Sequence, residues 1–85
     1  MIAMDEVREF IIENFLFGDR ERFEPALSFL ETGVIDSTGM LELVGFLESR
    51  YKIQIKDDEF VPEHLDSLDN IERFLRRKLD GEDRS

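Results

Sequence analysis

The sequence predicts an all-α fold: a small bundle of three main helices plus one short helix, with a long loop between the first and second helices. Apolar residues recur every three or four positions in three separate segments, which is the spacing of helices that bury one face. Two of these segments begin at an Asp-Ser pair, and both residue types favour helix N-termini. With 85 residues, the chain is expected to form one domain over residues 1–80 and a flexible C-terminal tail over residues 81–85.

The first helix is predicted to run from Met4 or Asp5 to Phe17. Asp5 and Glu6 place negative charge at the positive end of the helix dipole. Gly18 is expected to end the helix, because glycine readily adopts the left-handed conformation that follows many helices. The apolar positions that define this helix are Met4, Val7, Ile11 and Phe15.

The segment between the first two helices, residues 18–35, shows no clean periodicity, and Pro25 interrupts any helix there. It is nevertheless too apolar for a free linker, since it holds Leu27, Phe29, Leu30, Val34 and Ile35. We therefore expect a long ordered loop that packs onto the core and presents the start of the second helix. A simple crossover between two helices that do not pack antiparallel is equally compatible with the segment.

The second helix is predicted from Ser37 to Tyr51 or Lys52. Asp36 is placed to be its N-cap, which leaves Ser37 in the first turn beside backbone N–H groups that have no partner within the helix. One face should be buried, and its members are Met40, Leu43, Val44, Leu47 and Tyr51.

The rest of the chain is expected to form two shorter elements and the last helix. Residues 53–55 alternate like a strand but are too few, so a packed loop is predicted. Residues 57–60 could form one short helical turn, which Pro62 should limit. The last helix should begin at Asp66 and Ser67, interpreted as an ordinary cap, and end at Gly81.

The composition excludes several classes of function. With 21 acidic and 11 basic residues, the net charge of −10 argues against nucleic acid and against anionic membrane surfaces, and favours partners with basic patches. There is no cysteine and only one histidine, His64, so neither a metal site nor a nucleophilic triad is predicted. No apolar run reaches the length of a transmembrane helix, and we expect a cytoplasmic, monomeric protein.

The start of the second helix has a recognisable pattern. Asp36-Ser37, then residues 41–44 (Leu-Glu-Leu-Val), then Leu47-Glu48 and Tyr51, resemble the modification site of acyl carrier proteins and of the related peptidyl and aminoacyl carriers. The resemblance implies that Ser37 carries 4′-phosphopantetheine, attached from coenzyme A by a separate phosphopantetheinyl transferase. It also implies that Asp36 contacts the transferase. The function implied is that of a non-catalytic carrier, which holds an acyl or aminoacyl load as a thioester.

The same resemblance implies a docking face for partner enzymes on the second helix, made of Thr38, Leu41, Glu42, Gly45 and Glu48. The partners would be a loading ligase or synthetase and downstream acyl-processing enzymes with basic patches. Thr38 and Gly45 depart from the pattern of fatty-acid carriers, which favours a specialised pathway. Gly45 would permit the close approach either of a partner or of another helix.

Three alternatives accompany this hypothesis. Ser67 also follows an aspartate, but residues 69–72 lack the pattern that follows Ser37, so Ser37 is the predicted attachment site. Phe46, at the edge of the buried face, would either pack in the core or narrow a cavity between helices. The alternative function is a cofactor-free acidic helical adaptor that binds a protein partner through its second helix.

Overall fold

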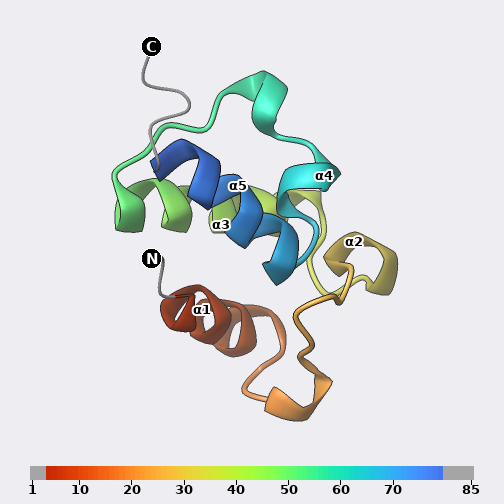
Figure 1. Ribbon diagram of the computed structural model, residues 1–85. Helices are drawn as coiled ribbons and strands as arrows, with labels where there is room; N and C mark the ends of the chain where they lie inside the picture. The colour runs from red at the N-terminus through yellow and green to blue at the C-terminus, as the bar shows by residue number, and fades with distance from the viewer. Residues whose placement is uncertain (1–3, 80–85) are drawn as a thin grey trace.

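The computed structural model describes residues 4–79, and the predicted tail lies outside them. Three long helices dominate the chain (Figure 1): α1 (Asp5–Phe15), α3 (Ser37–Tyr51) and α5 (Leu68–Leu79). Between them lie the short helices α2 (Phe29–Thr32) and α4 (Pro62–Leu65) and the 3-10 turns η1 (Arg20–Arg22) and η2 (Asp57–Glu59). The all-α prediction is confirmed. No helix among the described residues combines the length and the apolar character needed to cross a membrane.

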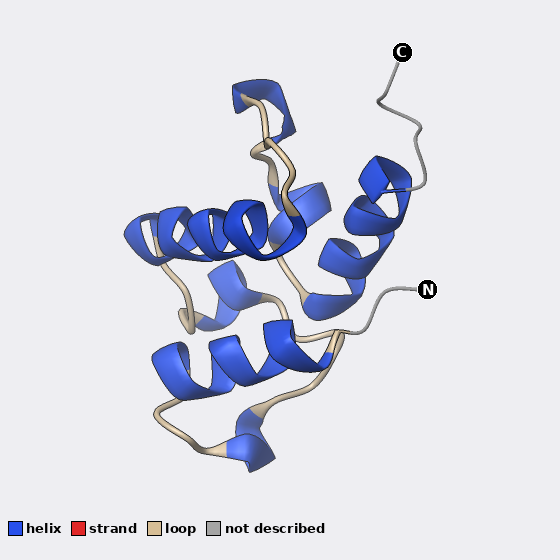
Figure 2. Cartoon of the chain, turned by 90° about the vertical axis from the view of Figure 1, so that its left-hand side faces the viewer, coloured by secondary structure: helices blue, strands red, loops and turns tan. Residues whose placement is uncertain are grey.

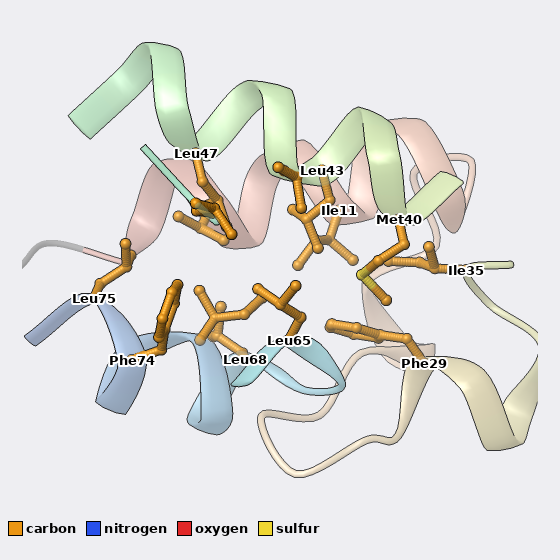
Figure 3. Packing of buried hydrophobic residues seen from close by; sticks show 14 residues of the cluster. Ile11, Phe29, Ile35, Met40, Leu43, Leu47, Leu65, Leu68, Phe74 and Leu75 are labelled. Atoms are coloured by element: carbon orange, nitrogen blue, oxygen red, sulfur yellow. The ribbon is translucent and has the colours of Figure 1, made fainter. Parts of the chain in front are cut away.

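The core lies where α3, α5 and α1 face one another. Figure 3 shows Leu47 of α3 pointing toward Phe74 and Leu75 of α5. At the other end of the cluster Met40 of α3 lies beside Phe29 and Ile35, with Leu43 of α3 and Ile11 of α1 between the two ends. All are at most 3% exposed, so the apolar face predicted for α3 is confirmed, although Tyr51 at its end is only half-buried. Burying side chains of this size stabilises the fold by roughly 1.5–3 kcal/mol each relative to exposure.

Helix α1 lies antiparallel to α3, as Figure 2 shows in side view. Near one end Glu6 of α1 pairs with Arg50 of α3, and at the other end Phe15 of α1 packs on Gly39 of α3. The Arg50 guanidinium donates a hydrogen bond to the Glu6 carboxylate and lowers its pKa. The side chains that join two helices far apart in the sequence thus fix their relative direction.

The predicted end of α1 at Phe17 is wrong, because the helix ends at Phe15. Phe17 already has a left-handed backbone, with φ of +53°, and Gly18 follows with φ of +85°. The N–H of Gly18 donates to the carbonyl of Ile12 at 2.9 Å, which closes the turn. The chain therefore leaves the helix before the glycine that was expected to stop it.

The loop over residues 18–35 packs as predicted, since Phe29 and Ile35 are buried at 0% and 1% exposure. The sequence did not predict α2 within it. The N-cap of α2 is Ser28, whose hydroxyl accepts a hydrogen bond from the N–H of Glu31 at 3.2 Å. Four residues carry too little periodicity to be recognised as a helix.

Asp66 corrects a second expectation. Its carboxylate does not cap α5: it accepts hydrogen bonds from the N–H of Leu30 at 2.9 Å and from the hydroxyl of Ser28. Its carbonyl accepts the N–H of Phe29 at 2.7 Å. Asp66 therefore ties α2 to the chain before α5, a contact between segments 36–38 residues apart in sequence.

The segment between α3 and α5 agrees with the prediction in two respects and departs in one. Residues 53–55 form a packed loop with Ile55 buried, and the short turn appears as η2. Pro62, however, does not merely limit that turn but begins α4. Proline is well suited to the first helical position, where no intrahelical N–H bond is lost. The bundle thus has one more short helix here than predicted.

Candidate functional site

The N-terminus of α3 is capped by Asp36, as predicted. Oδ1 of Asp36 accepts a hydrogen bond from the N–H of Gly39 at 2.7 Å, and its carbonyl accepts the N–H of Met40 at 2.8 Å. The residue has an extended backbone, with φ of −92° and ψ of −175°, which is typical of an N-cap. The cap holds the first turn of α3 at the surface.

Ser37 lies exposed in that first turn. Within residues 4–79 its hydroxyl makes no hydrogen bond, and neither its N–H nor that of Thr38 has a partner. Unpaired N–H groups and the positive end of the helix dipole together favour an anionic group at this position. A phosphate ester on Ser37 would therefore meet a favourable electrostatic environment.

The other serine that follows an aspartate has different surroundings. Ser67 is only 6% exposed, and its hydroxyl accepts a hydrogen bond from the N–H of Asn70 at 3.1 Å. That bond makes Ser67 the cap of α5, as predicted. Burial and this bond leave Ser67 poorly accessible to a modifying enzyme, whereas Ser37 is open to one.

A small apolar hollow of about 130 Å³ lies beside Ser37. It is open to solvent on one side and bounded by the first turn of α3, by α2 and by the chain that leads into α4. Apart from Ser37, its walls are Leu30, Met40, Phe60, Val61, Pro62 and Leu65. Any flexible group attached to Ser37 has this apolar surface within immediate reach.

One wall of that hollow is held in place by Glu59 of η2. Its carboxylate accepts the N–H of Lys56 at 2.9 Å and pairs with Nζ of Lys78 at 2.9 Å. Burial alone would raise the pKa of Glu59, but these two interactions outweigh it and the pKa is lowered. The pair joins η2 to α5 and so fixes Phe60, which directly follows Glu59.

The face of α3 predicted for partner docking is open in the structure. Thr38, Leu41, Glu42 and Gly45 are all exposed, and Leu41 is 61% exposed. Glu48 differs from them: it is half-buried, and its Oε2 accepts the N–H of Ile55 at 2.8 Å. Glu48 therefore already anchors the loop after α3, whereas the other four side chains face solvent.

The structure also places the two residues whose roles the sequence left open. A Cβ added to Gly45 would meet no heavy atom within 4 Å, so no other helix of residues 4–79 approaches it. The ring of Phe46 stacks on that of Phe10 in α1, with centroids 4.2 Å apart and planes at 14°. Phe46 thus packs at the edge of the core and does not line the hollow beside Ser37.

Sequence reasoning missed Gly39. A Cβ at this position would lie 2.8 Å from Cε1 of Phe15, closer than such atoms approach, and 3.1 Å from Cγ2 of Ile35, which is a tight contact. A glycine inside a helical pattern is the signal that could have revealed it, because such glycines often mark close packing. Gly39 lets α1 contact the same turn of α3 that carries Ser37.

Comparison with known proteins adds the last observation. The chain matches no protein-family model and no solved structure. It is 30% identical over 77 residues to the acyl carrier protein of Phenylobacterium zucineum (strain HLK1), across 91% of this chain and 94% of that protein. The match spans nearly all of both sequences, so it includes the capped N-terminus of α3 and the exposed Ser37. The chain belongs to the acyl carrier protein family.

Proposed function

We propose that this protein is an acyl or aminoacyl carrier whose 4′-phosphopantetheine arm is attached to Ser37. The observation that carries the proposal is the exposed, unengaged hydroxyl of Ser37 at the capped N-terminus of α3, in a member of the acyl carrier protein family. Asp36 keeps that turn in place. The protein is proposed to be non-catalytic and to act as the substrate of its partner enzymes.

The residues around Ser37 suit the group. The unpaired N–H groups of Ser37 and Thr38 are available to a phosphodiester, and the side chains around the hollow are apolar. When bound, phosphopantetheine supplies a terminal thiol that can hold a load as a thioester. The chain has no cysteine, so it offers no thiol of its own for that purpose.

The size of the hollow favours a short load. About 130 Å³ is well below the roughly 300–1,000 Å³ of pockets that enclose drug-sized ligands. A short acyl or aminoacyl group fits this space, whereas a long fatty chain would require the helices to move apart. The departures at Thr38 and Gly45 from the pattern of fatty-acid carriers favour a specialised pathway in the same way.

The partners we propose are a phosphopantetheinyl transferase, a loading ligase or synthetase, and downstream acyl-processing enzymes. Thr38, Leu41, Glu42 and Gly45 give them an exposed surface beside Ser37. The net charge of −10 favours enzymes with basic docking patches and gives an association rate that falls with salt. A cytoplasmic location and a monomeric state belong to the same proposal.

The intact mass of the protein before and after incubation with coenzyme A and a broad-specificity phosphopantetheinyl transferase tests the proposal. The expected result is a gain of one phosphopantetheine that is retained in Ser67→Ala and lost in Ser37→Ala. Circular dichroism of both variants checks that they remain folded. No gain in folded, unmodified wild-type protein would contradict the proposal and favour the cofactor-free adaptor.

A further inference from the structure

Phe17 combines two features that are unfavourable for the isolated protein. It has a left-handed backbone, with φ of +53°, which is costly for a residue with a Cβ and is usually reserved for glycine. Its side chain is 89% exposed, so no burial of the ring offsets that cost. Gly18, the residue suited to such a conformation, stands one position later. The folded chain therefore presents an aromatic ring to solvent at an energetic cost.

The place of Phe17 connects it to the modification site. It borders a hollow of about 350 Å³ between the end of α1 and the loop that leads into α3. Asp36, which directly precedes Ser37, lines the same hollow. The remaining walls are Asn14, Phe15, Arg22, Gly33 and Val34. An enzyme that covers Asp36 and Ser37 is thus close enough to contact Phe17 as well.

The surroundings of Phe17 resemble those of a contact residue in a protein interface. Aromatic side chains, phenylalanine among them, are enriched at protein interfaces, and the rim around them is polar. Here the ring is accompanied by the exposed polar side chains of Asn14, Arg22 and Asp36. Arg22 forms no ion pair among the described residues, so its charge is available to a partner.

We propose that Phe17 is a contact residue for the phosphopantetheinyl transferase, which buries the ring in an apolar part of its own surface. This inference rests on the function proposed above. The strained backbone of Phe17 is explained if its exposed ring contributes to binding a partner and not to the stability of the fold.

The chemistry of attachment selects the transferase among the possible partners. Oγ of Ser37 forms a bond to the phosphorus that carries pantetheine in coenzyme A, while the bond to the bridging pyrophosphate oxygen breaks. Adenosine 3′,5′-bisphosphate leaves, and the hydroxyl proton passes to a base of the transferase. That enzyme must therefore bring coenzyme A to bonding distance of Ser37 itself. Enzymes that act on the thiol work at the far end of the arm, so they need not cover Ser37 or Phe17.

The test measures stability and transferase kinetics on the same variants. Phe17→Gly should raise the midpoint of thermal unfolding by about 4–8 °C, because it relieves the strained backbone. It should also raise the KM of the broad-specificity transferase for the carrier at least about fivefold, with kcat unchanged. If Phe17 had a purely structural role, its replacement would not make the protein more stable and at the same time weaken its binding to the transferase.

Two control variants accompany the test. Phe17→Tyr keeps the ring and should keep the wild-type KM. Leu79→Ala removes another exposed apolar side chain, at the last residue of α5, and should leave KM within about twofold of wild type.

Three results would overturn the inference. A KM for Phe17→Gly within twofold of wild type, with the wild type modified, would contradict the inference alone. A lower unfolding midpoint would show that the ring stabilises the fold, contrary to the argument from strain. A wild-type protein that no transferase modifies would contradict the inference together with the proposed function.

Discussion

The ring of Phe15 occupies the space that a side chain on Gly39 would need: a Cβ there would lie 2.8 Å from Cε1 of Phe15. The end of α1 thus packs directly on the first turn of α3. Phe15 is itself held by Phe10, whose ring meets it edge-on with centroids 6.0 Å apart. The turn that presents Ser37 therefore packs against the end of α1 through Phe15.

This contact predicts different effects of alanine at two glycines of one helix. Gly45→Ala should stabilise the fold by about 1 kcal/mol, because its Cβ meets open space and alanine favours the helix. Gly39→Ala gains the same propensity but must displace Phe15 or Ile35, which costs about 1–3 kcal/mol. Urea unfolding of both variants should show Gly39→Ala to be less stable than Gly45→Ala by that amount. Equal stabilities would mean that Phe15 moves aside freely.

The two serines that follow an aspartate should differ in stability tests. Ser67→Ala removes the cap of α5 and should lower the free energy of unfolding by about 0.5–2 kcal/mol. Ser37→Ala removes no hydrogen bond within residues 4–79, so a change within about 0.5 kcal/mol is expected. Chemical unfolding at pH 7 measures both. A large loss in Ser37→Ala would indicate that its hydroxyl is chiefly structural.

Two roles of Asp36 can be tested separately: capping α3 and carrying a negative charge. Asp36→Ala should cost about 0.5–2 kcal/mol, whereas Asp36→Asn should be nearly neutral, because asparagine caps equally well. If the carboxylate also contacts the transferase, Asp36→Asn should be modified more slowly than wild type at unchanged stability. Unfolding curves and initial rates of modification on the same samples separate the two roles. A wild-type rate in Asp36→Asn would leave Asp36 with the cap alone.

The lowered pKa of Glu59 predicts that the stability of the fold depends on pH. Its folded-state pKa lies below the ordinary value of 4.5, so its charged form stabilises the fold above that pH. This contribution is lost as the pH falls through the folded-state pKa. Glu59→Gln should therefore lower the free energy of unfolding by about 1 kcal/mol at pH 7, where charged hydrogen bonds to Lys56 and Lys78 are lost. Urea unfolding from pH 7 to pH 3 should show this difference shrink, and a constant difference would contradict the prediction.

Much of the fold could be predicted from the sequence, because local physics decides it. Helix α3 begins and ends where its apolar spacing and its Asp36 cap predicted. Helix α5 begins after Ser67 for the same reason. Long amphipathic segments repeat the same signal over several turns, so single exceptions do not obscure it.

The short elements and the end of α1 could not be predicted, because they depend on distant contacts. Helix α2 has only four residues, and its first N–H groups are satisfied by Asp66, more than thirty positions later. The end of α1 departs from the expected glycine because Phe17 adopts a conformation that propensities disfavour.

For the site, the sequence by itself determined the identity of the candidate serine, its capping aspartate and the exposed face that follows them. Only the tertiary structure decided that Ser67 is buried, that Glu48 is engaged by Ile55, and that Phe17 stands beside Asp36. The physical reason is the range of the interactions. A cap and a helical face arise within a few residues, whereas burial and proximity depend on how the helices pack together.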